Sequence, residues 1–151
     1  TRGIPEIYYG TEILMPGDKS ASDGNVRMDF PGGWINDKQN AFTAQGRTTE
    51  QNEAYSFMQK MLHWRKDNEV IAKGTFKHFI PYNGVYVYER KFQGKSVVVF
   101  LNGTDQQKSI DLNPYKEVIR NRQARDIISE KVFDLENDLT IDEKGVLVFS
   151  F

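Results

Sequence analysis

The chain of 151 residues contains no cysteine, so disulfide bonds and thiolate metal sites are excluded. It also lacks a long apolar run: the longest covers residues 97–101, whereas a helix that crosses a bilayer needs about 20 residues. Neither sign of charge dominates, with 20 basic and 21 acidic residues. We therefore expect neither nucleic acid nor a membrane among its partners, since both attract an excess of positive charge. The 38% of hydrophobic residues suffices for a folded core.

Residues that could carry chemistry are scarce. The only histidines, His63 and His78, share no metal-ligand spacing with each other or with an acid, so we predict no metal site. No Gly-x-Ser-x-Gly motif or phosphate-binding loop occurs, and no two carboxylates are marked as a hydrolytic pair. Asn102-Gly103-Thr104 fits a glycosylation sequon, but a hairpin turn explains it better. The residues predict no catalytic group and no cofactor.

An apolar run over residues 4–9 ends in Gly10 and an acid, Glu12. This pattern is typical of a buried parallel strand that carries side chains to a functional rim. Such a strand is paired with neighbours, and nothing that could pair with it precedes it in the sequence. We therefore expect the chain to begin inside a larger domain. We also expect the unpaired strand to pack on the helix or sandwich described below, or on another copy of the chain.

A long loop and one helix follow this strand. Pro-Gly-Gly at residues 31–33 excludes a helix or central strand there, and loops of this length in compact proteins are usually functional or disordered. A helix is predicted over residues 49–67, where Thr48 and Gln51 have the spacing of a capping box. Residues at i, i+3 and i+4 spacing are predicted to form its core-facing stripe: Ala54, Phe57, Met58, Met61, Leu62 and Arg65.

The remaining residues, from 74 onward, are predicted to form strands only. Asn83-Gly84 separates two apolar runs and predicts a tight hairpin. The β-branched run over residues 96–101 is predicted to be a central strand. The expected strands cover residues 76–82, 85–92, 96–101, 109–112, 132–135, 139–141 and 146–151. Short strands at this spacing, without crossover helices, predict an antiparallel sandwich.

The segment over residues 3–12 resembles the Gly-x-Pro-x-Ile-Tyr-Tyr-Gly-x-Glu segment of glycoside hydrolase family 13, the α-amylase family. In that family the segment is the eighth strand of a catalytic (β/α)8 barrel, followed by a loop, the eighth helix and an all-β domain. Residues 63–71 and 144–149 are similar to the helix-to-sandwich junction and the last strand. The resemblance implies a mostly β fold: residues 1–72 as a remnant of a truncated barrel, and residues 73–151 as a Greek-key-like antiparallel β-sandwich.

Residues 23–34 are similar to a loop of cyclomaltodextrinase- and neopullulanase-type enzymes, although Asp29 and the spacing depart from their Arg-x-Pro-Met pattern. The resemblance implies a parent enzyme that hydrolyses α-glycosidic bonds in maltooligosaccharides, cyclodextrins or pullulan. The three catalytic acids of the family precede the segment at residues 3–12, so this chain is expected to carry no catalytic residue and to be inactive alone. The compartment stays open between export, for instance to a periplasm, and the cytoplasm.

The resemblance also singles out residues for binding. The residues expected to shape the rim are Tyr8, Tyr9, Gly10 and Glu12, which lie at the end of the predicted strand where barrel active sites gather. Arg27 and Asp29 are expected to hydrogen-bond sugar hydroxyls, and Trp34 to stack on a sugar face. The alternative for these three is a loop that packs on itself.

Two roles stay open for the sandwich. It either covers and stabilises the barrel, its expected partner, or it binds α-glucans through exposed aromatic residues. The candidates for the second role are Tyr82, Tyr86, Tyr88 and Phe92. Tyr86 and Tyr88 share one face of a predicted strand, opposite Val85 and Val87, and one of these two faces must be core.

Overall fold

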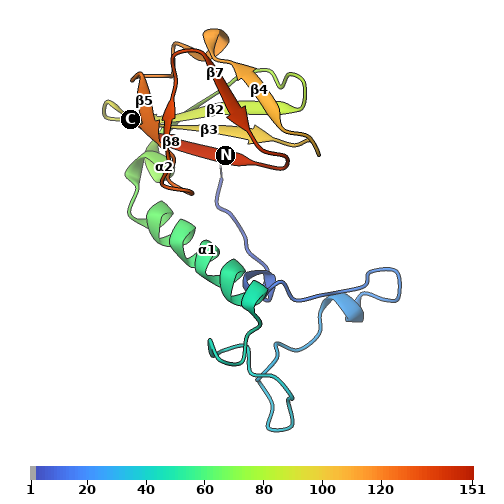
Figure 1. Cartoon of the computed structure of the whole chain (residues 1–151). Helices are drawn as coiled ribbons and strands as arrows, with labels where there is room; N and C mark the ends of the chain where they lie inside the picture. The colour runs from blue at the N-terminus through green and yellow to red at the C-terminus, as the bar shows by residue number, and fades with distance from the viewer. Residues whose placement is uncertain (1–2) are drawn as a thin grey trace. The chain divides into compact units, whose positions relative to one another are not determined.

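The computed structural model describes residues 3–151, which divide into two units, residues 3–64 and residues 65–151 (Figure 1). Each unit is described separately below. Among the described helices, none is both long enough and apolar enough to cross a membrane. The domain boundary predicted after residue 72 stays a prediction.

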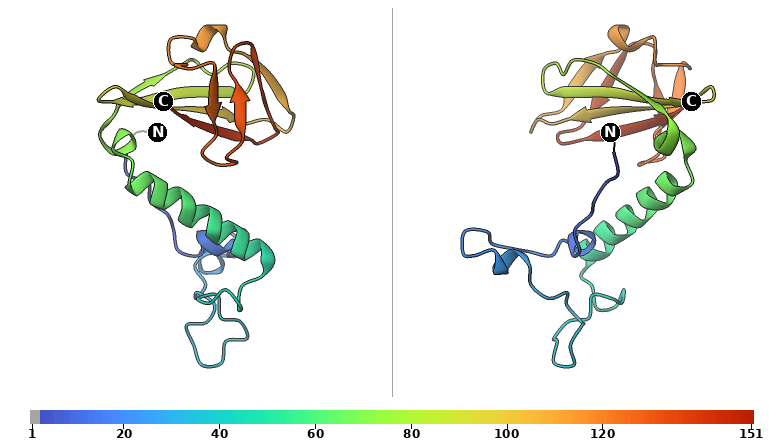
Figure 2. Two further views of the ribbon diagram at one scale, coloured as in Figure 1. Left: turned by 60° about the vertical axis from the view of Figure 1, so that its left-hand side comes forward. Right: turned by 180° about the vertical axis from the view of Figure 1, so that it is seen from behind.

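Residues 65–151 are built from antiparallel strands, as predicted. A four-stranded sheet has the order β1-β2-β3-β8, with β1 at Thr75–His78, β2 at Val85–Phe92, β3 at Lys95–Asn102 and β8 at Val146–Ser150. Two further pairs are β4 (Lys108–Asp111) with β7 (Asp138–Ile141), and β5 (Gln123–Arg125) with β6 (Val132–Asp134). The β4–β7 pair lies over one face of the four-stranded sheet (Figures 1 and 2). The Greek-key connection stays a prediction.

The hairpin between β1 and β2 confirms the prediction from Asn83-Gly84. Both residues have positive φ, 49° and 77°, which is the conformation that a two-residue turn of this hand requires. The backbones of Tyr82 and Val85 exchange hydrogen bonds of 3.0 and 2.9 Å across the turn. β1 itself ends at His78 rather than at residue 82, because Pro81 has no N–H to donate to the partner strand.

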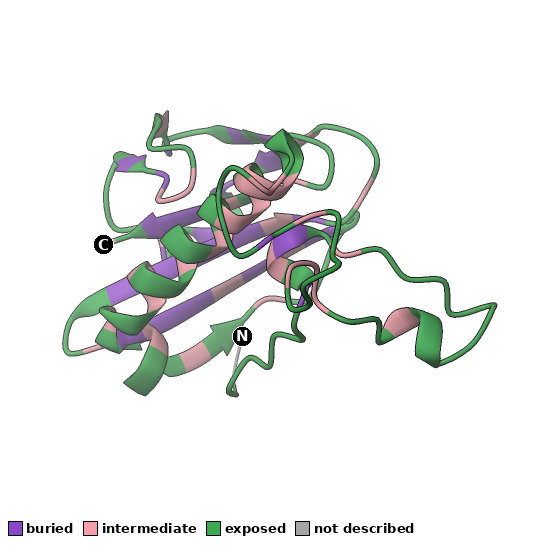
Figure 3. Ribbon diagram, turned by 90° about the horizontal axis from the view of Figure 1, so that it is seen from below, coloured by how far each residue is buried: buried purple, intermediate pink, exposed green. Residues whose placement is uncertain are grey.

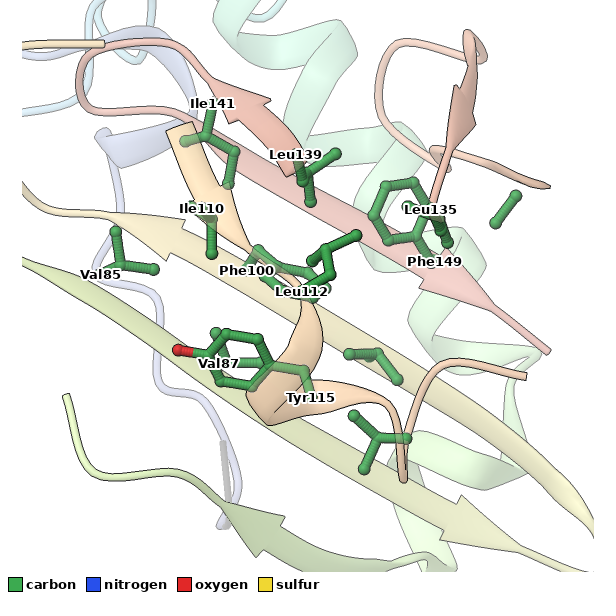
Figure 4. Packing of buried hydrophobic residues seen from close by; sticks show 13 residues of the cluster. Val85, Val87, Phe100, Ile110, Leu112, Tyr115, Leu135, Leu139, Ile141 and Phe149 are labelled. Atoms are coloured by element: carbon green, nitrogen blue, oxygen red, sulfur yellow. The ribbon is translucent and has the colours of Figure 1, made fainter. Parts of the chain in front are cut away.

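The core lies between the four-stranded sheet and the shorter strands. β3 is central, as predicted, and its Val98 and Phe100 are fully buried on the core face. They pack with residues from β2, β4, β7 and β8 and from the short 3-10 helix Asn113–Tyr115 (Figure 4). Tyr115 stands edge-on to Phe100, with 5.7 Å between ring centroids. Burial of these apolar side chains stabilises the unit, at roughly 1.5–3 kcal/mol per large residue.

A short helix that was not predicted, α2 (Glu69–Lys73), contacts β2 and β3. It begins where the side-chain oxygen of Asn68 accepts a hydrogen bond from the Val70 N–H at 3.1 Å, which caps the helix. Val70 is buried, and the Arg90 guanidinium of β2 donates to the Ile71 carbonyl oxygen at 2.9 Å. Five residues are too few to show a helical period, so the sequence pattern gave no indication of α2.

Residues 3–64 contain one long helix and little other regular structure. α1 covers Thr49–Lys66, close to the prediction, and its last two residues belong to the other unit. The capping box is confirmed: the Gln51 N–H donates to Thr48 Oγ1 at 3.2 Å, and the Thr48 N–H donates to Gln51 Oε1 at 3.0 Å. Two 3-10 turns, Thr11–Ile13 and Gly24–Val26, lie in the long loop.

Two predictions for this unit are not confirmed in this chain. No strand forms over residues 4–9; Ile4 is 97% exposed, and residues 1 and 2, at the start of the predicted barrel remnant, lie outside the described residues. A strand needs a hydrogen-bonded neighbour, and within residues 3–151 none pairs with this segment. The core-facing stripe of α1 is likewise not confirmed, because no residue of this helix is buried (Figure 3) and Phe57 is 52% exposed.

Candidate functional site

The turn at Gly10 is the best-defined feature of the predicted rim. Gly10 has φ 83°, and its carbonyl oxygen accepts hydrogen bonds from Ile13 N at 3.2 Å and Met15 N at 2.8 Å. A Cβ at this position would lie 2.7 Å from the Cβ of Met15, so no larger residue fits. Ile13 is fully buried beneath the turn. The turn holds the backbone of the neighbouring tyrosines in one place.

Tyr8 and Tyr9 lie side by side in front of this turn. Their ring centroids are 4.6 Å apart, and the Tyr9 hydroxyl donates to the Met28 carbonyl oxygen at 3.0 Å. Partial burial, and then the hydrogen-bonding contact with Tyr8, raise the pKa of Tyr9 above its ordinary value. Both tyrosines line an open hollow of about 500 Å³ together with residues 10, 11, 14–17 and 26. Tyr9 therefore joins the rim segment to the loop that carries the predicted binding residues.

Glu12 is half-buried in the first turn of the Thr11–Ile13 helix. Among the described residues it makes no side-chain hydrogen bond and no ion pair, so its bracing role at the rim stays a prediction. A carboxylate at the N-terminal end of even a short helix is favourable for the exposed N–H groups there.

The structure brings Asp29 and Trp34 together and leaves Arg27 apart. The indole Nε1 of Trp34 donates to Asp29 Oδ2 at 3.1 Å, while the ring remains 67% exposed. The Arg27 guanidinium instead lies 4.0 Å from the Asp23 carboxylate, at the limit of an exposed ion pair. The bond orients the indole and leaves its face accessible, which suits stacking on a sugar ring. Substrate binding by these three residues stays a prediction.

Asp37 positions this loop and was not identified from the sequence. One of its carboxylate oxygens, Oδ2, accepts the Gly32 N–H at 2.7 Å and the Trp34 N–H at 3.1 Å. Gly32 itself has φ 104° and packs against Asn40 so closely that a Cβ would lie 2.5 Å from Asn40 Oδ1. An acid three residues after a Pro-Gly-Gly-Trp turn could have been recognised, because Asp side chains bind the backbone of nearby turns.

The described residues hold no group of three or more His, Asp or Glu side chains that could bind a metal ion. His63 lies on α1 and His78 on β1, in different units. The predicted site residues in 3–64 therefore offer an exposed indole, two half-exposed tyrosines, the carboxylates of Glu12 and Asp29 and the guanidinium of Arg27. Such a set can hydrogen-bond and stack on a neutral ligand.

The aromatic residues of β2 occupy the face predicted for them. Val85 and Val87 point into the core, and Tyr86 and Tyr88 lie on the opposite face, where both are half-buried. Their rings, 5.6 Å apart, contact Phe76 and His78 of β1. Burial raises the pKa of Tyr88. Phe92 is also half-buried, so only Tyr82, 79% exposed, offers an open ring.

Asn102 has a structural role that the sequence did not indicate. It is buried at the end of β3, and its Nδ2 donates to the carbonyl oxygens of Gln106 at 2.7 Å and Asp142 at 2.8 Å. Its Oδ1 accepts from the N–H and the hydroxyl of Thr104, at 3.0 and 2.8 Å. The amide thereby ties the loop after β3 to the turn before β8. A sugar attached to Nδ2 would break this network, so the sequon is not a modification site in the fold.

Comparison with known proteins places these observations in a family. Residues 76–150 match the family model of the cyclomaltodextrinase C-terminal domain. The chain is 31% identical over 111 residues to a cyclomaltodextrinase of Thermoanaerobacter pseudethanolicus. The matched region covers 74% of this chain and 17% of that protein. It is 38% identical over 102 residues to an α-amylase of Niallia circulans, covering 68% of this chain and 16% of that protein. The matched part thus spans less than a fifth of these relatives' length.

Solved structures show the same fold. An α-amylase of Geobacillus thermoleovorans superimposes with a TM-score of 0.69 at 23% identity, over 98% of this chain and 29% of that chain. A cyclomaltodextrin glucanotransferase with three domains gives a TM-score of 0.71 at 21% identity, over 99% of this chain and 29% of that chain. At these identities the likeness establishes the fold and nothing about activity.

Proposed function

Because this chain belongs to the α-amylase family and carries that family's cyclomaltodextrinase-type C-terminal domain, we propose that it is the C-terminal part of a glycosidase. The enzyme hydrolyses α-glycosidic bonds in maltooligosaccharides, cyclodextrins or pullulan. Residues 1–72 complete its (β/α)8 barrel as the eighth strand, the long loop and the eighth helix. Residues 73–151 cover the barrel and stabilise it.

The observation that carries this proposal is the apolar surface of residues 3–64. Of the large hydrophobic residues that are exposed in the described chain, most lie in this unit: Ile4, Ile7, Tyr8, Tyr9, Leu14, Met28, Trp34, Ile35, Phe42, Phe57 and Leu62. Large exposed apolar patches mark interaction surfaces. The barrel supplies the partner, since Ile4 and Ile7 then pair within its sheet and Phe57 of α1 packs on its outer side.

The structural role of the β-rich unit is supported by its surface. Among its described residues, the exposed large hydrophobics are four: Ile80 and Tyr82 in the β1–β2 connection, Val132 on β6 and Val146 on β8. Tyr86, Tyr88 and Phe92 are half-buried and do not form an open row for a glucan chain. A domain with its own core and few open aromatic residues suits support better than extended glucan binding.

In the proposed enzyme the rim residues border the substrate cleft. Tyr8, Tyr9, Gly10 and Glu12 come at the C-terminal end of the eighth barrel strand, where the active sites of such barrels lie. The Asp29–Trp34 pair reaches the cleft from the following loop and contacts sugar, with Arg27 as a further donor. The catalytic acids come from preceding strands of the barrel, so the chain alone does not hydrolyse maltooligosaccharides.

The coding sequence upstream of residue 1 provides the decisive test. We expect it to continue in frame into a barrel with an Asp nucleophile, a Glu acid/base and a second Asp after strands four, five and seven. An in-frame stop codon, or an upstream domain without these acids, would refute the proposal. Turnover of maltoheptaose by the purified 151-residue chain would independently refute its inactivity.

In the isolated chain, the exposed apolar surface of residues 3–64 is expected to contact a second copy of the chain instead of the barrel. If the barrel is its natural partner, removing apolar groups such as Ile4 and Ile7 by substitution with Ser lowers self-association of the isolated chain, measured by sedimentation velocity. The same substitutions in the complete enzyme then destabilise the barrel, because the strand loses its buried side chains. Unchanged stability of the complete enzyme would contradict a buried strand at residues 4–9.

A further inference from the structure

A second hollow lies in the β-rich unit, at the end where β2 begins. It has a volume of about 270 Å³ and is lined by residues of the β1–β2 turn, β4 and the 3-10 helix that follows: Tyr82, Asn83, Val85, Lys108, Ser109, Ile110, Asp111, Pro114 and Tyr115. This volume corresponds to about nine water molecules at ~30 Å³ each. It lies just below the usual range for drug-sized ligands and suits a single ring with polar substituents.

We propose that this hollow is a surface site for one glucose unit of an α-glucan. The choice of α-glucan as ligand rests on the proposed function, whereas the choice of a sugar rests on the residues that line the hollow. They combine one open aromatic ring, a closed apolar floor and a rim with both donors and acceptors. This combination is what a pyranose needs, since it presents an apolar face of C–H groups and a circumference of hydroxyl groups.

The aromatic ring is that of Tyr82. It is the one aromatic side chain of the described β-rich unit that is mostly exposed. Its backbone is nevertheless fixed, because Tyr82 and Val85 exchange two hydrogen bonds across the Asn83-Gly84 turn. A ring held on a rigid turn loses little backbone freedom when it stacks on a ligand.

The floor consists of Val85, Ile110 and Tyr115, all of which are buried. The Tyr115 ring is locked edge-on against Phe79 and Phe100, at centroid distances of 4.9 and 5.7 Å. Its ring extends over β2, with the hydroxyl at the margin of the core cluster (Figure 4). That hydroxyl makes no hydrogen bond within residues 3–151, and an unpaired hydroxyl beside a hollow is a candidate ligand contact.

The rim provides complementary polar groups of balanced charge. The Lys108 ammonium forms no ion pair among the described residues and is available as a donor. Asp111 Oδ1 accepts from the backbone N–H and the side chain of Asn113, at 2.9 and 2.7 Å, which orients the carboxylate and leaves its other oxygen available as an acceptor. One positive and one negative group leave the rim without net charge, which favours a neutral polyhydroxylated ligand over an ion of either sign.

The test is an amide NMR titration of the 151-residue chain with maltotriose, and with cellotriose as the β-linked control. We expect maltotriose to shift amide signals of Asn83, Gly84 and Asp111 with millimolar affinity, and cellotriose to bind at least fivefold more weakly. Equal binding of both sugars would overturn the assignment to α-glucans. No shifts at 20 mM maltotriose, roughly the weak limit of a useful site, would overturn the site itself.

Matched variants separate stacking from hydrogen bonding. Tyr82→Ala is expected to weaken maltotriose binding at least tenfold, whereas Tyr82→Phe, which keeps the ring, retains affinity within about threefold. Tyr115→Phe removes only the hydroxyl and is expected to weaken binding about three- to tenfold. Val132→Ala, at an exposed site on β6 outside the hollow, serves as the control without effect. Unchanged binding by Tyr82→Ala would overturn the proposal, and none of these results depends on the upstream coding sequence that tests the proposed function.

Discussion

The two units of this chain bury their apolar residues to very different extents. Residues 65–151 hold nearly all of the fully buried hydrophobic side chains of the described chain, whereas residues 3–64 hold only Ile13 and Ala41. Residues 3–64 also hold most of the large apolar residues that are exposed in the described chain. One unit is therefore stabilised by its own core, and the other is organised by local hydrogen bonds at its turns and at the start of α1. The difference indicates that an apolar residue is a core residue only where a partner surface exists.

The largest test of this contrast compares the same side chain in both units. Phe100→Ala removes a fully buried ring from the core of the β-rich unit and is expected to lower the free energy of unfolding by about 3–5 kcal/mol. Phe57→Ala on α1 removes a half-exposed ring and is expected to cost less than about 0.5–1 kcal/mol. Urea denaturation followed by circular dichroism measures both. Equal losses would contradict the comparison.

The buried amide of Asn102 tests whether polar contacts also hold the β-rich unit together. Asn102→Asp removes the two donors to the carbonyl oxygens of Gln106 and Asp142 and places a negative charge beside them. We expect a loss of about 2–4 kcal/mol, since each unsatisfied buried group costs roughly 1–3 kcal/mol. Asn83→Asp, in the exposed turn where Asp also tolerates positive φ, is the control and is expected to change stability little. A small effect of Asn102→Asp would show that water replaces the network.

The capping box tests how far local interactions stabilise residues 3–64. Thr48→Ala removes the acceptor of the Gln51 N–H and is expected to destabilise the first turn of α1 by about 1 kcal/mol. Hydrogen exchange of the amides in the first turn measures this, with faster exchange expected there and no change in β3. Ser56→Ala, in the exposed middle of α1, is the control and should preserve or slightly raise helicity. Loss of protection in β3 would indicate that the two units unfold together.

The smallest expected effect concerns how the free energy of unfolding falls at alkaline pH. Burial, and secondly the charge of Asp111, raise the pKa of Tyr115 above its ordinary value. The unfolded state therefore ionises first, and stability present below about pH 10 falls as pH rises from there through the pKa of the folded state. Tyr115→Phe is expected to reduce the loss of urea midpoint between pH 8 and pH 11. Part of the loss remains, because burial also raises the pKa of Tyr88. An unchanged loss would assign the effect to other groups.

Local patterns were sufficient where the chain itself supplies the interaction. The Asn83-Gly84 hairpin, the Thr48–Gln51 capping box and the central strand β3 were all predicted, because a turn conformation, a cap and a β-branched run depend on neighbouring residues. The alternation of Val85 and Val87 with two tyrosines also placed the correct face of β2 toward the core.

The contacts within the candidate site could be predicted from the sequence only in part. The pattern placed Asp29 and Trp34 in one loop, but their hydrogen bond and the separation of Arg27 follow from how Asp37 holds the turn. The hollow beside Tyr82 is lined by the β1–β2 turn and by β4 with the residues that follow it. The turn and β4 are some 25 residues apart in the sequence. No periodicity indicates that such segments meet.

The sequence by itself determined seven of the eight described strands, the Asn83-Gly84 turn, the helix α1 with its cap and the family resemblance, because these depend on side-chain types at short spacing. It did not indicate β5, which has only three residues. The tertiary structure decided which of the remaining apolar runs are buried. Residues 4–9 and the stripe of α1 have the composition of core elements, yet residues 4–9 are exposed and no residue of the stripe is fully buried in this chain. Burial requires a second surface to pack against, and its free energy is gained only when that surface is present.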